Sequence, residues 1–292
     1  MAYTTGSAVS MAALQTAIFD SCVNDGWSAS GDFLTKAGIP VRIQAVGETL
    51  QILGGEGFSS GALVNPGPNY SQIAGSGLVF PLTWHVFTFP QEVYVVVEYA
   101  AGRFQWMAWG KSTVAGIGGS GVWYCASQGS SVSAGLACHL TSSSTSNASG
   151  ALFWTSNFSG TATRNNHIHS GMGGASGWEY SGNSVVEGKM YGSQDTMGLL
   201  GWLPSAWNSE AVLLPLRCYL WRTEGFVSLA VDLEHARVTR IDNYEPGQIL
   251  NIGGTRWKVF PWHLKDADNR NGITGSPYHS GTLGWAIRYE GP

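Results

Sequence analysis

Segments with the alternating pattern of β-strands, joined by short turns, constrain the fold of this chain more than any other sequence feature. Val41 to Val46 and Thr49 to Leu53 lie on either side of Gly47-Glu48, as the strands of a hairpin lie around their turn. Glu92 to Tyr99 and Arg103 to Trp109 are rich in β-branched and aromatic residues and are separated by a short turn. These patterns predict a mainly β protein of antiparallel sheets, with a sandwich as the expected arrangement.

The C-terminal part of the chain carries further strand and hairpin patterns. The expected strands are Phe226 to Val231 paired with Ala236 to Ile241, Gln248 to Ile252 paired with Thr255 to Phe260, and a last strand over Leu283 to Tyr289. Gly253-Gly254 separates the second pair. Two glycines favour a tight hairpin there, because both central positions of such a turn need positive φ.

One N-terminal segment has the pattern of an α-helix. Leu14, Ile18 and Cys22 form an apolar stripe at i, i+4 spacing within Ala8 to Asn24. Ser10 stands where a side-chain oxygen caps the first turn of a helix. We therefore expect one helix near the N-terminus and strands and turns almost everywhere else.

The low content of charged residues and the high content of aromatic residues indicate what kind of surface to expect. Charged residues make up 12% of the 292 residues, about half the usual share of a soluble domain, whereas the chain holds 13 tryptophans and 40 glycines. Amphipathic aromatics in place of charge favour a surface covered by other subunits. A large β fold with many glycine turns is the alternative explanation.

Composition and local pattern also exclude some classes of protein. The net charge of −4 argues against bulk binding of nucleic acid, which depends on phosphate neutralisation by Lys and Arg. No run of 18 apolar residues is present, so no membrane span is expected, and the N-terminus lacks the pattern of a signal peptide. The four cysteines show no C-x-x-C spacing and are expected to be reduced and buried.

The glycine and serine content changes along the chain and suggests a division into three parts. Residues 1–109 are expected to hold the N-terminal helix and a β core. Residues 110–201 form a Gly/Ser-rich region of loops and short strands, which is a possible insertion. Residues 202–292 are expected to complete the core with the C-terminal hairpins.

Three blocks of sequence carry a resemblance to a known group of proteins. They are Met1 to Ser7 (MAYTTGS) with the short helix ending at Gly26-Trp27, Phe104 to Ser127 (FQWMAWGKSTVAGIGGSGVWYCAS), and Tyr244 to Trp262 (YEPGQILNIGGTRWKVFPW) followed by His279 to Thr282 and Gly284 to Ala286. In these blocks the chain resembles virion structural proteins of the tail tip or baseplate of tailed bacteriophages.

This resemblance implies a non-enzymatic structural role. A subunit of this kind is expected to act through contacts with other copies of itself and with other phage tail proteins. Its expected location is the virion tail, after assembly in the host bacterial cytoplasm. We predict Trp202, Trp207 and Trp262, which stand next to prolines or polar turns, as interface residues.

His167 and His169 form the sharpest local motif of the chain. A His-x-His on a strand places both imidazoles on one face, because side chains alternate with period two. In a threefold assembly, three such pairs converging on the axis would suit iron or another transition metal. The arrangement resembles His-x-His iron sites of phage fibres and spike tips. Neighbouring glycines favour the alternative, a polar loop with two solvated histidines and no cofactor.

Two other functions of a tail protein stay open on the sequence. The first is a receptor- or glycan-binding module, with the loops of residues 110–201 as the recognition surface for a host glycan or receptor. The second, less favoured, is a glycan-degrading enzyme that uses paired carboxylates. Its candidate residues are Glu179, Glu187 and Asp195, beside the aromatic residues Trp178, Tyr180 and Tyr191.

A hydrolase-like motif fails on its local context. Gly57 to Gly61 matches the G-x-S-x-G pattern around Ser59. A nucleophile elbow needs a helix directly after the serine, and Pro66 and Pro68 follow too closely for one to begin. We therefore predict no catalytic residue in this chain.

Overall fold

The computed structural model describes residues 1–73, 78–129, 137–138, 148–149, 151–153, 165–172, 176–180, 190–191, 212–222, 225–241, 243–265 and 283–291. Within these residues the chain forms three antiparallel sheets and one α-helix near the N-terminus. The predicted fold class is confirmed. The division of the chain at residues 109 and 201 stays a prediction.

The first sheet, here called the central sheet, has seven strands in the order β1-β8-β9-β10-β11-β15-β16. Its strands are β1 (Ala2–Ala8), β8 (Leu82–Thr88), β9 (Glu92–Ala100), β10 (Arg103–Lys111), β11 (Val122–Ala126), β15 (Asn166–His169) and β16 (Trp178–Tyr180). β9 and β10 form the predicted hairpin. Tyr94 and Val96 point to one buried cluster, and Val93, Val95 and Val97 point to another. The continuous apolar run of β9 therefore reflects burial on both faces.

The second sheet packs on one face of the central sheet together with the helix. Its order is β12-β7-β5-β4-β3-β2, and β6 pairs with β5. The elements are α1 (Met11–Asn24), β2 (Ser28–Ser30), β3 (Phe33–Lys36), β4 (Ile39–Val46), β5 (Thr49–Ser59), β6 (Ala62–Pro66), β7 (Ser71–Ile73) and β12 (Gln128–Gly129). β4 and β5 form the predicted hairpin. Leu14, Ile18 and Cys22 of α1 are fully buried, as the apolar stripe predicts.

The third sheet covers the opposite face of the central sheet and has the order β17-β18-β19-β22-β21-β20. Its strands are β17 (Met190–Tyr191), β18 (Leu214–Trp221), β19 (Val227–Arg240), β20 (Ile249–Ile252), β21 (Thr255–Pro261) and β22 (Leu283–Arg288), and a separate parallel pair consists of β13 (Ala137–Cys138) and β14 (Ala148–Ser149). Gly253-Gly254 joins β20 to β21, and both glycines have positive φ as predicted.

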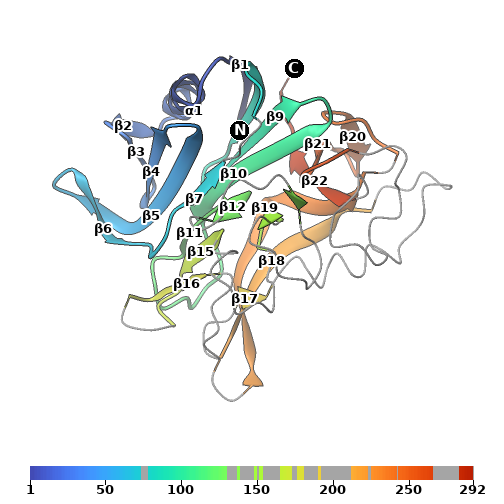
Figure 1. Cartoon of the computed structure of the whole chain (residues 1–292). Helices are drawn as coiled ribbons and strands as arrows, with labels where there is room; N and C mark the ends of the chain where they lie inside the picture. The colour runs from blue at the N-terminus through green and yellow to red at the C-terminus, as the bar shows by residue number, and fades with distance from the viewer. Residues whose placement is uncertain are drawn as a thin grey trace.

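The three sheets form three layers, with the central sheet between the other two. Figure 1 shows α1 and β2 to β6 on one side, in blue to cyan, and β18 to β22 on the other, in orange and red. One buried cluster joins the central and third sheets around Trp106 and Trp285. A second cluster joins the central and second sheets and α1 around Trp109 and Tyr124. Strands from residues 110–201 extend the central sheet, since β11, β15 and β16 follow β10 in its order.

One predicted hairpin is wrong. Phe226 to Val231 does not pair with Ala236 to Ile241, because one continuous strand, β19, covers almost all of both segments. β19 pairs with β18, and over its second half also with β22. The backbone N–H groups of Glu234 and His235, expected in the turn, donate to the carboxylate of Glu92 at 3.0 and 3.1 Å. A side chain distant in sequence therefore accepts the backbone N–H groups at this point, and the strand stays extended.

Ser10 caps α1 as predicted, and its loss should weaken the protein. The backbone N–H of Ala13 donates to Ser10 Oγ at 3.1 Å, and Ser10 itself has extended backbone angles. We expect Ser10→Ala to lower the free energy of unfolding by about 1 kcal/mol, because one N–H at the start of the helix loses its acceptor. Urea denaturation followed by circular dichroism measures this change. Ser10→Asp, which keeps a capping oxygen, should stay near wild type.

Candidate functional site

His167 and His169 lie on β15, between β11 and β16 in the central sheet. Their rings share one face of the strand, as the period of two predicts. The ring of His167 stacks on Tyr124 with 4.5 Å between centroids, and the ring of His169 lies 5.1 Å from that of Trp178. Both histidines are buried in this chain, with exposed fractions of 0% and 5%.

This burial corrects one of the two sequence interpretations of the motif, the polar loop. The histidines are not solvated residues of a loop, because they belong to a strand that is hydrogen-bonded on both sides. The metal site on a symmetry axis stays a prediction. Among the described residues, no group of three or more His, Cys, Asp and Glu side chains is arranged to hold a metal ion.

Hydrogen bonds fix the orientation of the His169 ring. Ser120, in the loop before β11, donates its backbone N–H to Nδ1 of His169 at 3.0 Å, and its Oγ lies 3.0 Å from the same nitrogen. A nitrogen that accepts from an N–H carries no proton of its own. The neutral imidazole of His169 therefore carries its proton on Nε2.

A polar pocket of about 520 Å³ opens beside Nε2 of His169. Its lining residues come from β5, β6, β15 and the loops before β11 and β16, and they are Glu56, Asn65, Gly118, Gly119, Ser120, His169, Gly171, Ser176 and Gly177. Glycine is required next to the imidazole, because a Cβ at Gly177 would stand 2.9 Å from Nε2, and its φ is +67°. The glycines thus keep the edge of His169 accessible from the pocket.

Asn65 is held rigidly at the edge of this pocket. Its φ of 42° lies in the left-handed region, which asparagine tolerates better than most residues. The indole N–H of Trp178 donates to its backbone oxygen at 2.9 Å. Its own Nδ2 donates to the backbone oxygen of Ser176 at 2.8 Å and lies 3.3 Å from Glu56 Oε2. The side-chain amide therefore presents its NH₂ group, not its oxygen, to this part of the pocket.

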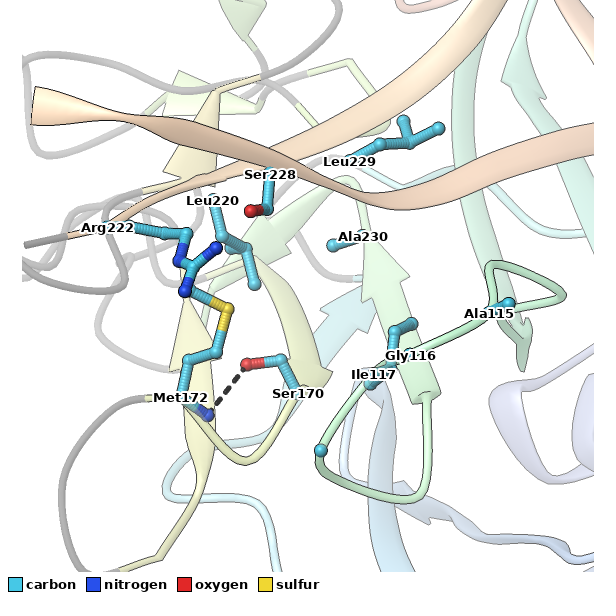
Figure 2. Close-up of a pocket in the computed structure, with 11 residues that line it drawn as sticks. Ala115, Gly116, Ile117, Ser170, Met172, Leu220, Arg222, Ser228, Leu229 and Ala230 are labelled. Atoms are coloured by element: carbon cyan, nitrogen blue, oxygen red, sulfur yellow. Dashed lines mark hydrogen bonds between the residues drawn. The ribbon is translucent and has the colours of Figure 1, made fainter.

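A second pocket of about 370 Å³ lies on the other side of the loop before β11. Ile117, Met172 and Leu220 give it apolar walls, and the exposed Arg222 adds one positive charge. Figure 2 shows that its side chains come from β18, β19, this loop and the turn after β15. The two pockets share Gly118.

Burial sets the electrostatics behind the histidines. It raises the pKa of the Tyr124 phenol well above its usual range, so the phenol stays neutral and donates to the backbone oxygen of Asn69 at 2.5 Å. Burial likewise raises the pKa of the thiols of Cys22, Cys125 and Cys218. These three cysteines are free and buried, as predicted.

The carboxylates considered for glycan cleavage are placed only in part. Glu179 is fully buried, and the hydroxyl and backbone N–H of Ser170 donate to it. It does not line either pocket described above. Glu187 and Asp195 lie outside the described residues. Ser59 ends strand β5 at a hairpin turn, so the G-x-S-x-G motif is not followed by a helix.

The predicted interface tryptophans are likewise placed in part. Trp202 and Trp207 lie outside the described residues. The predicted interface position of Trp262 is corrected. Its side chain is buried, with an exposed fraction of 1%, and its ring stacks on Trp285 with 4.6 Å between centroids. The neighbouring proline and polar turn suggested a surface position, but the third sheet folds this segment onto the central sheet.

Sequence reasoning missed Glu56, Asn65 and Ser120, the residues that surround the edge of His169. They come from three separate segments, and Asn65 stands 104 positions before His169. An asparagine directly before a proline is a weak turn signal, and no local pattern connects it to the histidine motif. Only the packing of the second sheet against the central sheet brings these residues together.

No family model matches the chain, and no curated protein matches it either. Within the described residues, no helix is both long and apolar enough to span a membrane.

Proposed function

We propose that this chain is a structural component of a phage tail tip or baseplate, which acts through contacts between subunits and not through catalysis. The virion assignment comes from the sequence resemblance, and the low charge and high aromatic content support a surface made for partners. The expected partners are other copies of the chain and other tail proteins.

The exposed apolar side chains at the end of the β18–β19 hairpin are the main structural support for this proposal. Figure 1 shows the hairpin extending away from the three layers. Phe226 and Val227 at its end are 65% and 52% exposed. Burial of apolar surface against a partner is favourable by about 25 cal/mol for every Å², so these exposed side chains would stabilise an interface. We name Phe226, Val227 and the pocket beside Arg222 the hairpin surface.

Self-association tests the hairpin surface. We expect sedimentation velocity to show concentration-dependent oligomers of the purified chain, and Phe226→Ser with Val227→Ser to weaken them about tenfold or more. Val9→Ser is the matched control, because Val9 is 76% exposed but lies between β1 and α1. A wild-type chain that stays monomeric at high concentration, or a double variant that assembles like wild type, would contradict this role.

A receptor- or glycan-binding module of the tail is the second candidate function. The polar pocket beside His169 favours it, because a pocket with few charges and several fixed hydrogen-bonding groups suits a small polar ligand. The glycan-degrading alternative has no comparable support, since the one described carboxylate of its candidate set is buried against Ser170.

A further inference from the structure

The pocket beside His169 holds a hydrogen-bond donor that has no acceptor among the described residues. Nδ1 of His169 accepts from the backbone of Ser120, so Nε2 carries the proton. The nearest polar group to Nε2 is Nδ2 of Asn65 at 3.4 Å, which is itself a donor because it donates to the backbone oxygen of Ser176. Two donors therefore face each other in the lining of the pocket.

The side chain of His169 is enclosed on its other sides. It is 5% exposed, and the ring of Trp178 lies against it. A buried N–H without an acceptor is destabilising, so a ligand acceptor that enters the pocket would satisfy this group. The site is thus preorganised for a ligand atom that accepts a hydrogen bond.

Glu56 supplies the complementary group. Its Oε2 lies 3.3 Å from the same Asn65 Nδ2 that approaches His169, so the carboxylate and the imidazole border one small region of the pocket. Glu56 is exposed, and it is the only charged residue among the described residues that line the pocket. A carboxylate accepts hydrogen bonds and repels anions, so phosphate, sulfate and carboxylate ligands are disfavoured.

The geometry points to a neutral saccharide as the ligand of this pocket. A hydroxyl group accepts a hydrogen bond and donates one, so neighbouring hydroxyls of a sugar ring satisfy both the Nε2–H of His169 and the carboxylate of Glu56. A volume of about 520 Å³ accommodates one or two sugar rings. A divalent cation fits less well, because the protonated Nε2 has no lone pair to offer.

This inference deepens the second candidate function and is independent of the hairpin surface, which is tested by self-association. Saccharide binding is measured with methyl glycosides of the common neutral hexoses and N-acetylhexosamines, by saturation-transfer-difference NMR and calorimetry. At least one glycoside is expected to bind with a Kd on the order of 1 mM, as a small polar ligand of about a dozen heavy atoms does. No binding of any glycoside up to about 50 mM overturns the inference.

Variants locate the binding in the pocket. Glu56→Ala is expected to weaken glycoside binding about tenfold, because a charge-assisted hydrogen bond is lost. Glu56 is exposed, so the fold should not suffer. Glu48→Ala, an exposed carboxylate in the β4–β5 turn, is the matched control and should bind like wild type. Equal binding by Glu56→Ala and wild type overturns the inference.

The protonation of the imidazole gives a readout that does not depend on any variant. Long-range ¹H–¹⁵N NMR spectra are expected to show His169 protonated on Nε2 and unprotonated on Nδ1, and the bound glycoside should shift the Nε2 resonance. His169→Phe assigns the signals. A proton on Nδ1, or a glycoside that binds without moving the His169 signals, counts against the proposed site.

Discussion

Replacing Glu92 with alanine should destabilise the protein by about 3–5 kcal/mol, because it leaves several buried donors without their shared acceptor. Glu92 begins β9 and is 5% exposed. Its carboxylate accepts from the Tyr94 hydroxyl at 2.7 Å and from His235 Nδ1 at 2.8 Å. It also accepts the backbone N–H groups of Glu234 and His235. One side chain thus connects the central sheet to the middle of β19 in the third sheet.

Urea denaturation followed by intrinsic fluorescence measures this effect, and graded variants test its cause. Glu92→Gln keeps one acceptor oxygen and should lose less stability than Glu92→Ala. Glu48→Ala removes an exposed carboxylate and should stay within about 0.5 kcal/mol of wild type. If the free energy of unfolding of Glu92→Ala lies within about 1 kcal/mol of the wild-type value, the carboxylate does not hold the two sheets together in the way described.

The same carboxylate explains why one hairpin was predicted wrongly while others were confirmed. The hairpins around Gly47-Glu48 and Gly253-Gly254 are set by turn residues and alternation within a few positions, so the sequence contains the relevant information. The stretch around Glu234 also resembles a turn locally. It stays extended because Glu92, 142 positions away, accepts its backbone N–H.

The candidate site shows a similar limit. Alternation along β15 correctly predicted that His167 and His169 share a face. Their burial depends on Tyr124 and Trp178, and the access to Nε2 depends on Gly177 and the β6 residue Asn65. These contacts join separate segments of the chain, so no periodicity near the histidines indicates them. The motif was therefore visible in the sequence, whereas its chemistry was not.

The tryptophan cluster between the central and third sheets shows how such contacts carry stability. Trp285 on β22 is fully buried. Its ring stacks on Trp262 at 4.6 Å between centroids and lies 5.7 Å from the rings of both Trp106 and Tyr94. Large rings from both sheets thus meet at one point. Neighbouring side chains cannot fill the space of a buried ring of this size, so its removal leaves a cavity. The loss of the ring should therefore weaken the contact between the two layers.

Trp285→Ala is therefore expected to lower the free energy of unfolding by about 3–5 kcal/mol. The indole N–H of Trp285 has no hydrogen-bond partner within the described part of the chain. Trp285→Phe should consequently lose packing but no hydrogen bond, at a cost of about 1–2 kcal/mol. Urea denaturation measures both changes, and near-ultraviolet circular dichroism reports whether the ring cluster persists. Equal stability of the alanine and phenylalanine variants would show that ring packing at Trp285 does not hold the layers together, whereas the expected difference would assign it that role.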